Sequence, residues 1–125
     1  MKKLFLSFII SCLFMPACFG ANYNTRTPLP GNTLANRKLQ YDTIMPVYMA
    51  TGTKLKNCET MSIINTKVTR QPYNLKMQGG QYTQGQWEEL WTVNACGKTA
   101  DVPIKFILDS TGATYMISPN NIVIR

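Results

Sequence analysis

The residues best suited to covalent chemistry are four cysteines, which separate into two groups along the chain. Cys12 and Cys18 lie in an apolar N-terminal segment, whereas Cys58 and Cys96 lie in the remainder. The chain contains no histidine, so catalytic arrangements that pair Cys or Ser with His have no base. The cysteines also lack the C-x-x-C spacing of redox and metal sites. We therefore predict no metal site and no cofactor.

Paired carboxylates are the other common route to catalysis, and Glu88 and Glu89 are adjacent in the sequence. Neighbouring residues on a strand point to opposite faces, so these two cannot form the facing pair that glycoside hydrolysis needs. A Ser and Lys dyad stays open through Ser62, Ser110 or Ser118, but no local motif selects one of them. Phosphate-binding and dinucleotide-binding glycine motifs are absent from the sequence. We predict no catalytic residues and favour a protein that is not an enzyme.

Aromatic side chains offer a binding chemistry instead, because they stack on sugars or bases and pack against protein partners. The candidate binding residues are Trp87, Glu89, Tyr73 and Tyr82. Trp91 is expected in the core, two strand positions before Val93. Glu89 shares a strand face with both tryptophans, so we expect it either at a rim or paired with Lys105 or Arg70.

The N-terminal segment has the pattern of an export signal. Two lysines precede an apolar run over residues 4–15, which proline and small residues follow. The run is shorter than the roughly 20 apolar residues of a transmembrane helix. We predict a signal peptide over residues 1–20 and a mature protein in the periplasm or outside the cell, without a transmembrane segment. A lipid anchor on Cys12 or Cys18 is the less favoured alternative.

Export also predicts the state of the remaining cysteines. Exported chains meet an oxidising environment, so Cys58 and Cys96 are expected to form one structural disulfide. Removal of the signal leaves 105 residues, enough for one small domain. Residues 21–33 are rich in Asn, Thr, Pro and Gly and predict an extended, mobile leader, and residues 34–125 predict a single domain.

The mature chain is basic, with 11 Lys and Arg residues against 6 Asp and Glu residues. The basic residues are scattered rather than clustered. Such a surface favours solubility and attraction to anionic polymers of the cell envelope. It is weak support for nucleic-acid binding, which we do not favour.

One short helix is expected before the sheet. Apolar residues between Leu39 and Tyr48 fall near helical spacing, but Pro46 would interrupt one long helix. Because proline is well tolerated in a first helical turn, the pattern predicts a short helix over residues 45–55.

Strand patterns follow Cys58. One strand is expected over residues 63–68, ending by Pro72, and the polar, glycine-rich residues 73–86 predict a long loop or an irregular hairpin. The clearest strand covers residues 87–95.

The rest of the chain predicts a meander. Residues 102–108 alternate as a second strong strand, with Pro103 near its start or at a sheet edge. Shorter strands are expected around residues 115–117 and over residues 122–124. The fold class predicted is α+β: a short helix followed by an antiparallel sheet of about four or five strands, with one disulfide.

Two segments of this sheet resemble a family of small uncharacterised exported proteobacterial proteins. They are W-E-E-L-W-T-V-N-A-C-G over residues 87–97 and D-V-P-I-K-F-I-L-D-S-T-G-A-T-Y over residues 101–115. In that family an E-x-W-x-V-x-x-C-G strand precedes a V-x-V-x-F strand and a Gly-Thr turn, with an earlier cysteine upstream. The matching positions are Glu89, Trp91, Val93, Cys96, Gly97, Val102, Ile104, Phe106, Gly112 and Thr114. The resemblance covers residues 58–117 and implies a cysteine-bridged, exported, β-rich domain without a specified activity.

The function expected from these observations is that of a small exported binding or accessory protein without catalytic activity. Its partner would be a protein or an envelope polymer. Two alternatives stay open: a secreted effector or enzyme with its site near residues 73–87, and a binder of anionic envelope polymer or nucleic acid.

Overall fold

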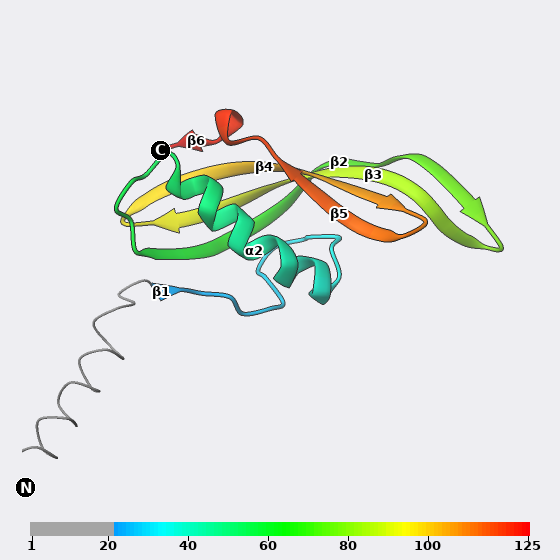
Figure 1. Ribbon diagram of the computed structural model, residues 1–125, viewed down its shortest axis with the longest axis horizontal. Coiled ribbons are helices and arrows are strands. Elements are labelled where there is room, and N and C mark those ends of the chain that lie inside the picture. The colour runs from blue at the N-terminus through cyan, green and yellow to red at the C-terminus, as the bar shows by residue number, and fades with distance from the viewer. Residues whose placement is uncertain (1–21) are drawn as a thin grey trace, which may run out of the picture.

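The structure of the protein is a computed structural model that describes residues 22–125. The predicted signal peptide, with Cys12 and Cys18, lies outside the described residues. The elements follow the order β1 (Asn22–Tyr23), α2 (Arg37–Gly52), β2 (Thr60–Gln78), β3 (Gln81–Ala95), β4 (Lys98–Asp109), β5 (Gly112–Ile117), the 3-10 helix η1 (Pro119–Asn121) and β6 (Val123–Ile124). Figure 1 shows α2 lying across the sheet, with the β2–β3 hairpin reaching past the other strands.

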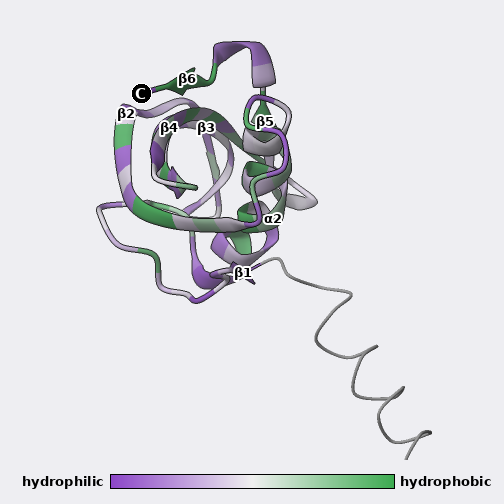
Figure 2. Ribbon diagram, turned by 90° about the vertical axis from the view of Figure 1, so that its left-hand side faces the viewer, coloured by the Kyte–Doolittle hydropathy of each residue, from purple (hydrophilic) through white to green (hydrophobic). Residues whose placement is uncertain are grey.

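The strands form one curled sheet in the order β1-β2-β3-β4-β5, and β6 pairs with β4. β1 runs parallel to β2, and the other pairs are antiparallel. The sheet wraps around α2 as a half-barrel, seen nearly end-on in Figure 2. The predicted α+β fold, with a helix followed by an antiparallel meander, is confirmed.

The helix α2 begins eight residues earlier than the sequence predicted, so the expected boundaries at residues 45–55 are wrong. Asn36 caps it, because its side-chain oxygen accepts a hydrogen bond from the Leu39 backbone nitrogen at 2.9 Å. Ile44, Val47 and Tyr48 are each at most 1% exposed and face the sheet. No helix within residues 22–125 has the length and apolar content needed to cross a membrane.

Pro46 lies inside α2 rather than in its first turn. A proline has no backbone N–H, so the carbonyl of Asp42 loses its partner four residues later. Asp42 is exposed and Pro46 is partly exposed, so water can satisfy that carbonyl. Burial of the opposite helix face offsets the lost bond, which explains why the helix continues through the proline.

The leader before α2 lies along β2 and is hydrogen-bonded to it. Its backbone nitrogens at Asn24 and Asn32 donate to the carbonyls of Met61 and Thr66 at 3.1 and 3.0 Å. Gly31 has φ 102°, and a β-carbon there would overlap the Thr66 backbone. The leader thus covers the outer edge of β2 as far as Thr66.

The core lies between α2 and the inner faces of β3 and β4. Trp91, Val93, Val102 and Phe106 are fully buried, which confirms the predicted strand faces and the place of Trp91. The rings of Trp91 and Phe106 lie 5.9 Å apart between centroids.

Pro103 was predicted near a strand start or at a sheet edge; the strand start is wrong, whereas the edge holds locally, because Pro103 has a strand partner on one side only. It lies in the middle of β4, opposite Leu90 of β3. On its other side, β6 pairs with β4 up to Asp101 and β5 pairs only from Ile104 onward. The proline therefore occupies a gap in that ladder, where a missing N–H breaks no strand pairing.

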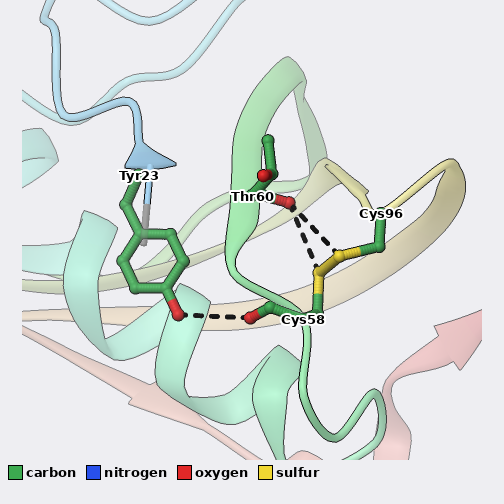
Figure 3. The surroundings of a disulfide bond; sticks show 4 residues. All are labelled: Tyr23, Cys58, Thr60 and Cys96. Carbon is green, nitrogen blue, oxygen red and sulfur yellow. Dashed lines mark hydrogen bonds between the residues drawn. A yellow bond between two sulfur atoms is a disulfide. The ribbon is translucent and has the colours of Figure 1, made fainter. Parts of the chain in front are cut away.

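The disulfide Cys58–Cys96 is confirmed, with the two Cα atoms 5.8 Å apart. It joins the segment before β2 to the two-residue turn between β3 and β4 (Figure 3). Cys96 and Gly97 have φ of 51° and 79°, the positive values that such a turn requires at both positions. The Tyr23 hydroxyl donates to the Cys58 carbonyl at 3.3 Å, so β1 is held beside the bridge.

Candidate binding site at the base of the arm

Residues 73–86, which the sequence predicted as a loop or an irregular hairpin, form the projecting end of the β2–β3 hairpin. We call this segment the arm (Figure 1). β3 pairs with β4 only from Gly85 onward, so most of the arm extends past the sheet. Gly79 and Gly80 supply its turn, with φ of 61° and 80°.

The arm carries three large apolar side chains that are exposed, Leu75, Met77 and Tyr82. Met77 and Tyr82 are cross-strand partners and therefore share a face. Their exposed fractions are 60% and 55%, and that of Leu75 is 42%. Exposed apolar side chains clustered on one surface often mark a binding site.

A pocket of about 410 Å³ opens at the base of the arm. Its walls come from the residue that follows the leader, from both strands of the hairpin and from the end of β4. The lining residues are Leu34, Pro72, Leu75, Tyr82, Gly85, Gln86, Trp87 and Leu108. Trp87 is only 9% exposed, and its ring stacks on Phe106 with centroids 5.0 Å apart. The pocket is therefore largely apolar and has a rigid aromatic wall.

Glu89 lies beneath this wall and is 1% exposed. Its Oε2 accepts hydrogen bonds from Trp87 Nε1 at 2.7 Å and from the Leu34 backbone nitrogen at 2.9 Å. Its Oε1 accepts one from Trp91 Nε1 at 2.8 Å. The expectation that Glu89 sits at a rim or pairs with Lys105 or Arg70 is wrong.

Three N–H donors replace a cation as the partners of this buried carboxylate. Burial of a charge is costly unless hydrogen bonds satisfy its oxygens, and bonds to an ionised acceptor are the strong ones. Glu89 thereby fixes two pocket residues that are far apart in the sequence, Leu34 and Trp87. We assign it as a positioning residue of the pocket rather than a contact for a ligand.

Tyr73, the fourth predicted binding residue, lies away from the pocket. Its hydroxyl donates to Glu88 Oε2 at 2.9 Å, and the guanidinium carbon of Arg70 lies 3.6 Å from its ring centroid. Desolvation and the hydrogen bond to Glu88 raise the pKa of Tyr73 above the usual phenol value. Trp87 and Tyr82 thus share the pocket, whereas Tyr73 belongs to a polar cluster with Arg70 and Glu88.

The sequence predictions missed the aliphatic walls of the pocket. Leu34, Leu75 and Leu108 come from three segments that meet only in the fold. Gly85 was the available signal, because a β-carbon there would lie 2.7 Å from Leu75 Cδ2. A glycine in a strand often marks such a close approach.

The pocket offers little for catalysis or metal binding. Tyr82 carries its only ionisable side chain. Within residues 22–125, no group of three or more His, Cys, Asp or Glu side chains is placed to hold a metal ion. The arrangement can hold an apolar group, but it offers no nucleophile and base side by side.

A second hollow of about 360 Å³ lies between the start of α2 and the β4–β5 turn. Its walls are mostly polar, and its Lys38 and Asp42 are paired with each other at 2.8 Å. The apolar pocket at the arm is therefore the stronger candidate for binding.

Comparisons with known proteins found no matching protein family, no similar curated protein and no similar solved structure. The resemblance based on residues 58–117 therefore stays a prediction.

Proposed function

We propose that this protein is an exported binding protein, without catalytic activity, that captures an apolar group of its partner in the pocket at the base of the arm. The observation that carries the proposal is the pocket itself. It combines exposed apolar residues such as Leu75 and Tyr82 with a buried, hydrogen-bonded Trp87. Preorganised aromatic and aliphatic walls limit the entropy lost on binding.

Two further observations support binding over catalysis. The chain has no histidine, and apart from the Tyr82 phenol the pocket lining has no acid, base or thiol. The enzyme alternative placed a site near residues 73–87, and the side chains that converge there are mostly apolar. A pocket lined mostly by apolar side chains favours recognition of a partner over catalysis.

The binding proposal is tested by selecting short peptides from a displayed random library on the purified, disulfide-bonded protein. Tyr82→Ser should weaken the selected peptides at least tenfold, about 1.4 kcal/mol, because it removes one wall of the pocket. Tyr41→Ser is the matched control, since Tyr41 is 62% exposed on α2 and Tyr82 is 55% exposed. Equal affinities for the two variants, or no selected peptides, would contradict the proposal.

The proposed export is tested separately by the intact mass of the protein from fractionated native cells. We expect a chain that begins near Ala21, lies in the periplasm or the medium, and gains about 2 Da when its one disulfide is reduced. A mass that retains residues 1–20 would argue against export with cleavage. A lipid-sized excess on Cys12 or Cys18 would instead identify an anchored protein.

A further inference from the structure

The arm has a strand edge without a partner, and this edge lies beside the pocket. β3 pairs with β2 as far as Gln81, but it pairs with β4 only from Gly85 onward. Within residues 22–125, residues 81–84 therefore have a neighbouring strand on one side only. Such an edge presents backbone N–H and C=O groups to an added strand. None of these four residues is a proline or carries a charge, two features that commonly protect a free edge.

A β-bulge shapes this edge. Lys76 and Met77 are adjacent on β2, but their partners on β3 are Gln84 and Tyr82, so Thr83 is an extra residue. Bulges occur beside binding sites, where they redirect a side chain. The bulge explains why Tyr82 lines the pocket together with Gly85, three positions away.

A hollow lies on each face of the sheet at the point where β4 stops pairing with β3. The apolar pocket lies on the face of Trp87, and a second hollow of about 180 Å³ lies on the other face. Gln86 precedes Trp87 along β3 and pairs with Ile107, so these two residues share that other face. The second hollow is lined by Asn74, Gln84, Gly85, Gln86, Ile107, Leu108 and Asp109. Gly85, Gln86 and Leu108 line both hollows, which therefore meet at the free edge.

We infer that the partner binds as an extended segment of another protein, which adds as a strand to residues 81–84 of β3. This inference rests on the proposed function and names the form of its partner. Successive side chains of a strand point to opposite faces, so one side chain enters the pocket and the next enters the second hollow. The first is apolar, because it packs against Tyr82 and Trp87. The second is polar, because Asn74, Gln84 and Asp109 line the second hollow.

A second copy of this chain fits the edge less well. Pairing of two arms through this edge would place residues 81–84 of both chains side by side. Tyr82 is the only large apolar residue among them, and it already forms a wall of its own pocket. It is therefore not free to fill the pocket of the other copy.

A small apolar molecule or a lipid chain also fits less well. Either could fill the pocket, but neither would bond to the backbone groups of residues 81–84 or to the polar side chains of the second hollow. An added strand uses all three features at once. Its main-chain hydrogen bonds supply affinity, and the side-chain hollows supply specificity.

The experiment uses library peptides that Tyr82→Ser weakens. Each peptide amide is N-methylated in turn, which removes one N–H and leaves the side chains unchanged. A strand added to a single edge directs every second N–H toward that edge. We expect methylation to weaken binding by about tenfold or more at alternate central positions, and by less than about twofold at the positions between them.

Gln84 and Gln81 provide a matched pair of substitutions on the same strand. Both residues are exposed, but Gln84 lines the second hollow and Gln81 lines neither hollow. Gln84→Ala should weaken the peptides about three- to tenfold, because their polar side chain loses a hydrogen-bond partner. Gln81→Ala should change their affinity by less than about twofold. Equal effects of the two substitutions would overturn the use of the second hollow.

The remaining outcomes separate this inference from the proposed function. Tyr82-dependent peptides that tolerate methylation at every central position, or at none, would overturn strand addition but leave the proposed function standing. Loss of all Tyr82 dependence would overturn both. A dimer of the free protein in sedimentation experiments that Tyr82→Ser dissociates would overturn a separate protein as the occupant.

Discussion

Replacement of Glu89 by glutamine removes the charge from the carboxylate that fixes the pocket while it preserves the size of the side chain. In the native protein, Oε2 accepts from Trp87 Nε1 and the Leu34 nitrogen, and Oε1 accepts from Trp91 Nε1. The glutamine oxygen can take the place of Oε2 and keep two of these bonds. Its amide nitrogen then faces the Trp91 indole N–H, so two donors oppose each other.

The expected loss of stability follows from the one hydrogen bond that is lost and the two that are retained. One buried donor without an acceptor costs about 1–3 kcal/mol, and each of the two retained bonds loses about 1 kcal/mol when its acceptor becomes neutral. The neutral amide is cheaper to bury than the carboxylate, which offsets part of the loss. We expect Glu89→Gln to lower the free energy of unfolding by about 2–4 kcal/mol, a large share of a small domain's stability.

Urea unfolding of the oxidised protein, followed by tryptophan fluorescence, measures this difference. Glu88→Gln is the matched control on the neighbouring residue, because its side chain is 39% exposed and its partner Arg70 is 59% exposed. The control should change stability by less than about 1 kcal/mol. Equal effects of the two substitutions, within about 0.5 kcal/mol, would refute the role assigned to Glu89.

Three further predictions concern stability. Tyr48→Phe should cost about 1–3 kcal/mol in urea unfolding, because it removes a buried hydroxyl that donates to the leader and accepts from β2; a cost below about 0.5 kcal/mol would contradict this role. Replacement of Cys58 and Cys96 by serine should cost about 4 kcal/mol, since the bridge closes a loop with a sequence separation of 38, and an unchanged melting temperature would argue against the bridge. The hydrogen bond from Arg125 holds the pKa of Asp101 below its usual value. The folded pKa is therefore lower than the unfolded value of about 3.9, so this stabilisation is present above about pH 4 and is lost as pH falls through the folded pKa. Asp101→Asn should flatten that part of the stability curve measured by urea unfolding, and an unchanged curve would contradict the assignment.

The strands and the disulfide could be predicted because their signals are local. Alternation along residues 87–95 and 102–108 identified the buried faces, and two cysteines allow one pairing. The start of α2 had a local signal as well, in the capping residue Asn36. Pro46 argued against a helix that starts at Arg37, because a proline inside a helix removes one backbone hydrogen bond. Burial of the apolar face of α2 against the sheet offsets that loss, and this burial can be seen only in the folded structure.

The pocket could be predicted only in part because its walls come from distant segments. Trp87 and Tyr82 were predicted as binding residues from their aromatic type, but Leu34 reaches the site through a hydrogen bond to Glu89 across 55 positions. The alternation of side chains along a strand predicted that Glu89 lies on the same face as the two tryptophans. Its hydrogen-bond partners could not be predicted, because the direction of each indole N–H depends on side-chain packing.

The most direct test of the proposed binding site is an NMR titration of the isotope-labelled protein with a peptide selected on it. The chain has only two tryptophans, so its two indole N–H signals report on Trp87 at the pocket and Trp91 in the core. We predict that the Trp87 indole signal and the amide signals of Leu34, Leu75 and Tyr82 shift, while the Trp91 indole signal shifts far less. Shifts confined to the exposed face of α2, or spread without the arm, would contradict binding at this pocket.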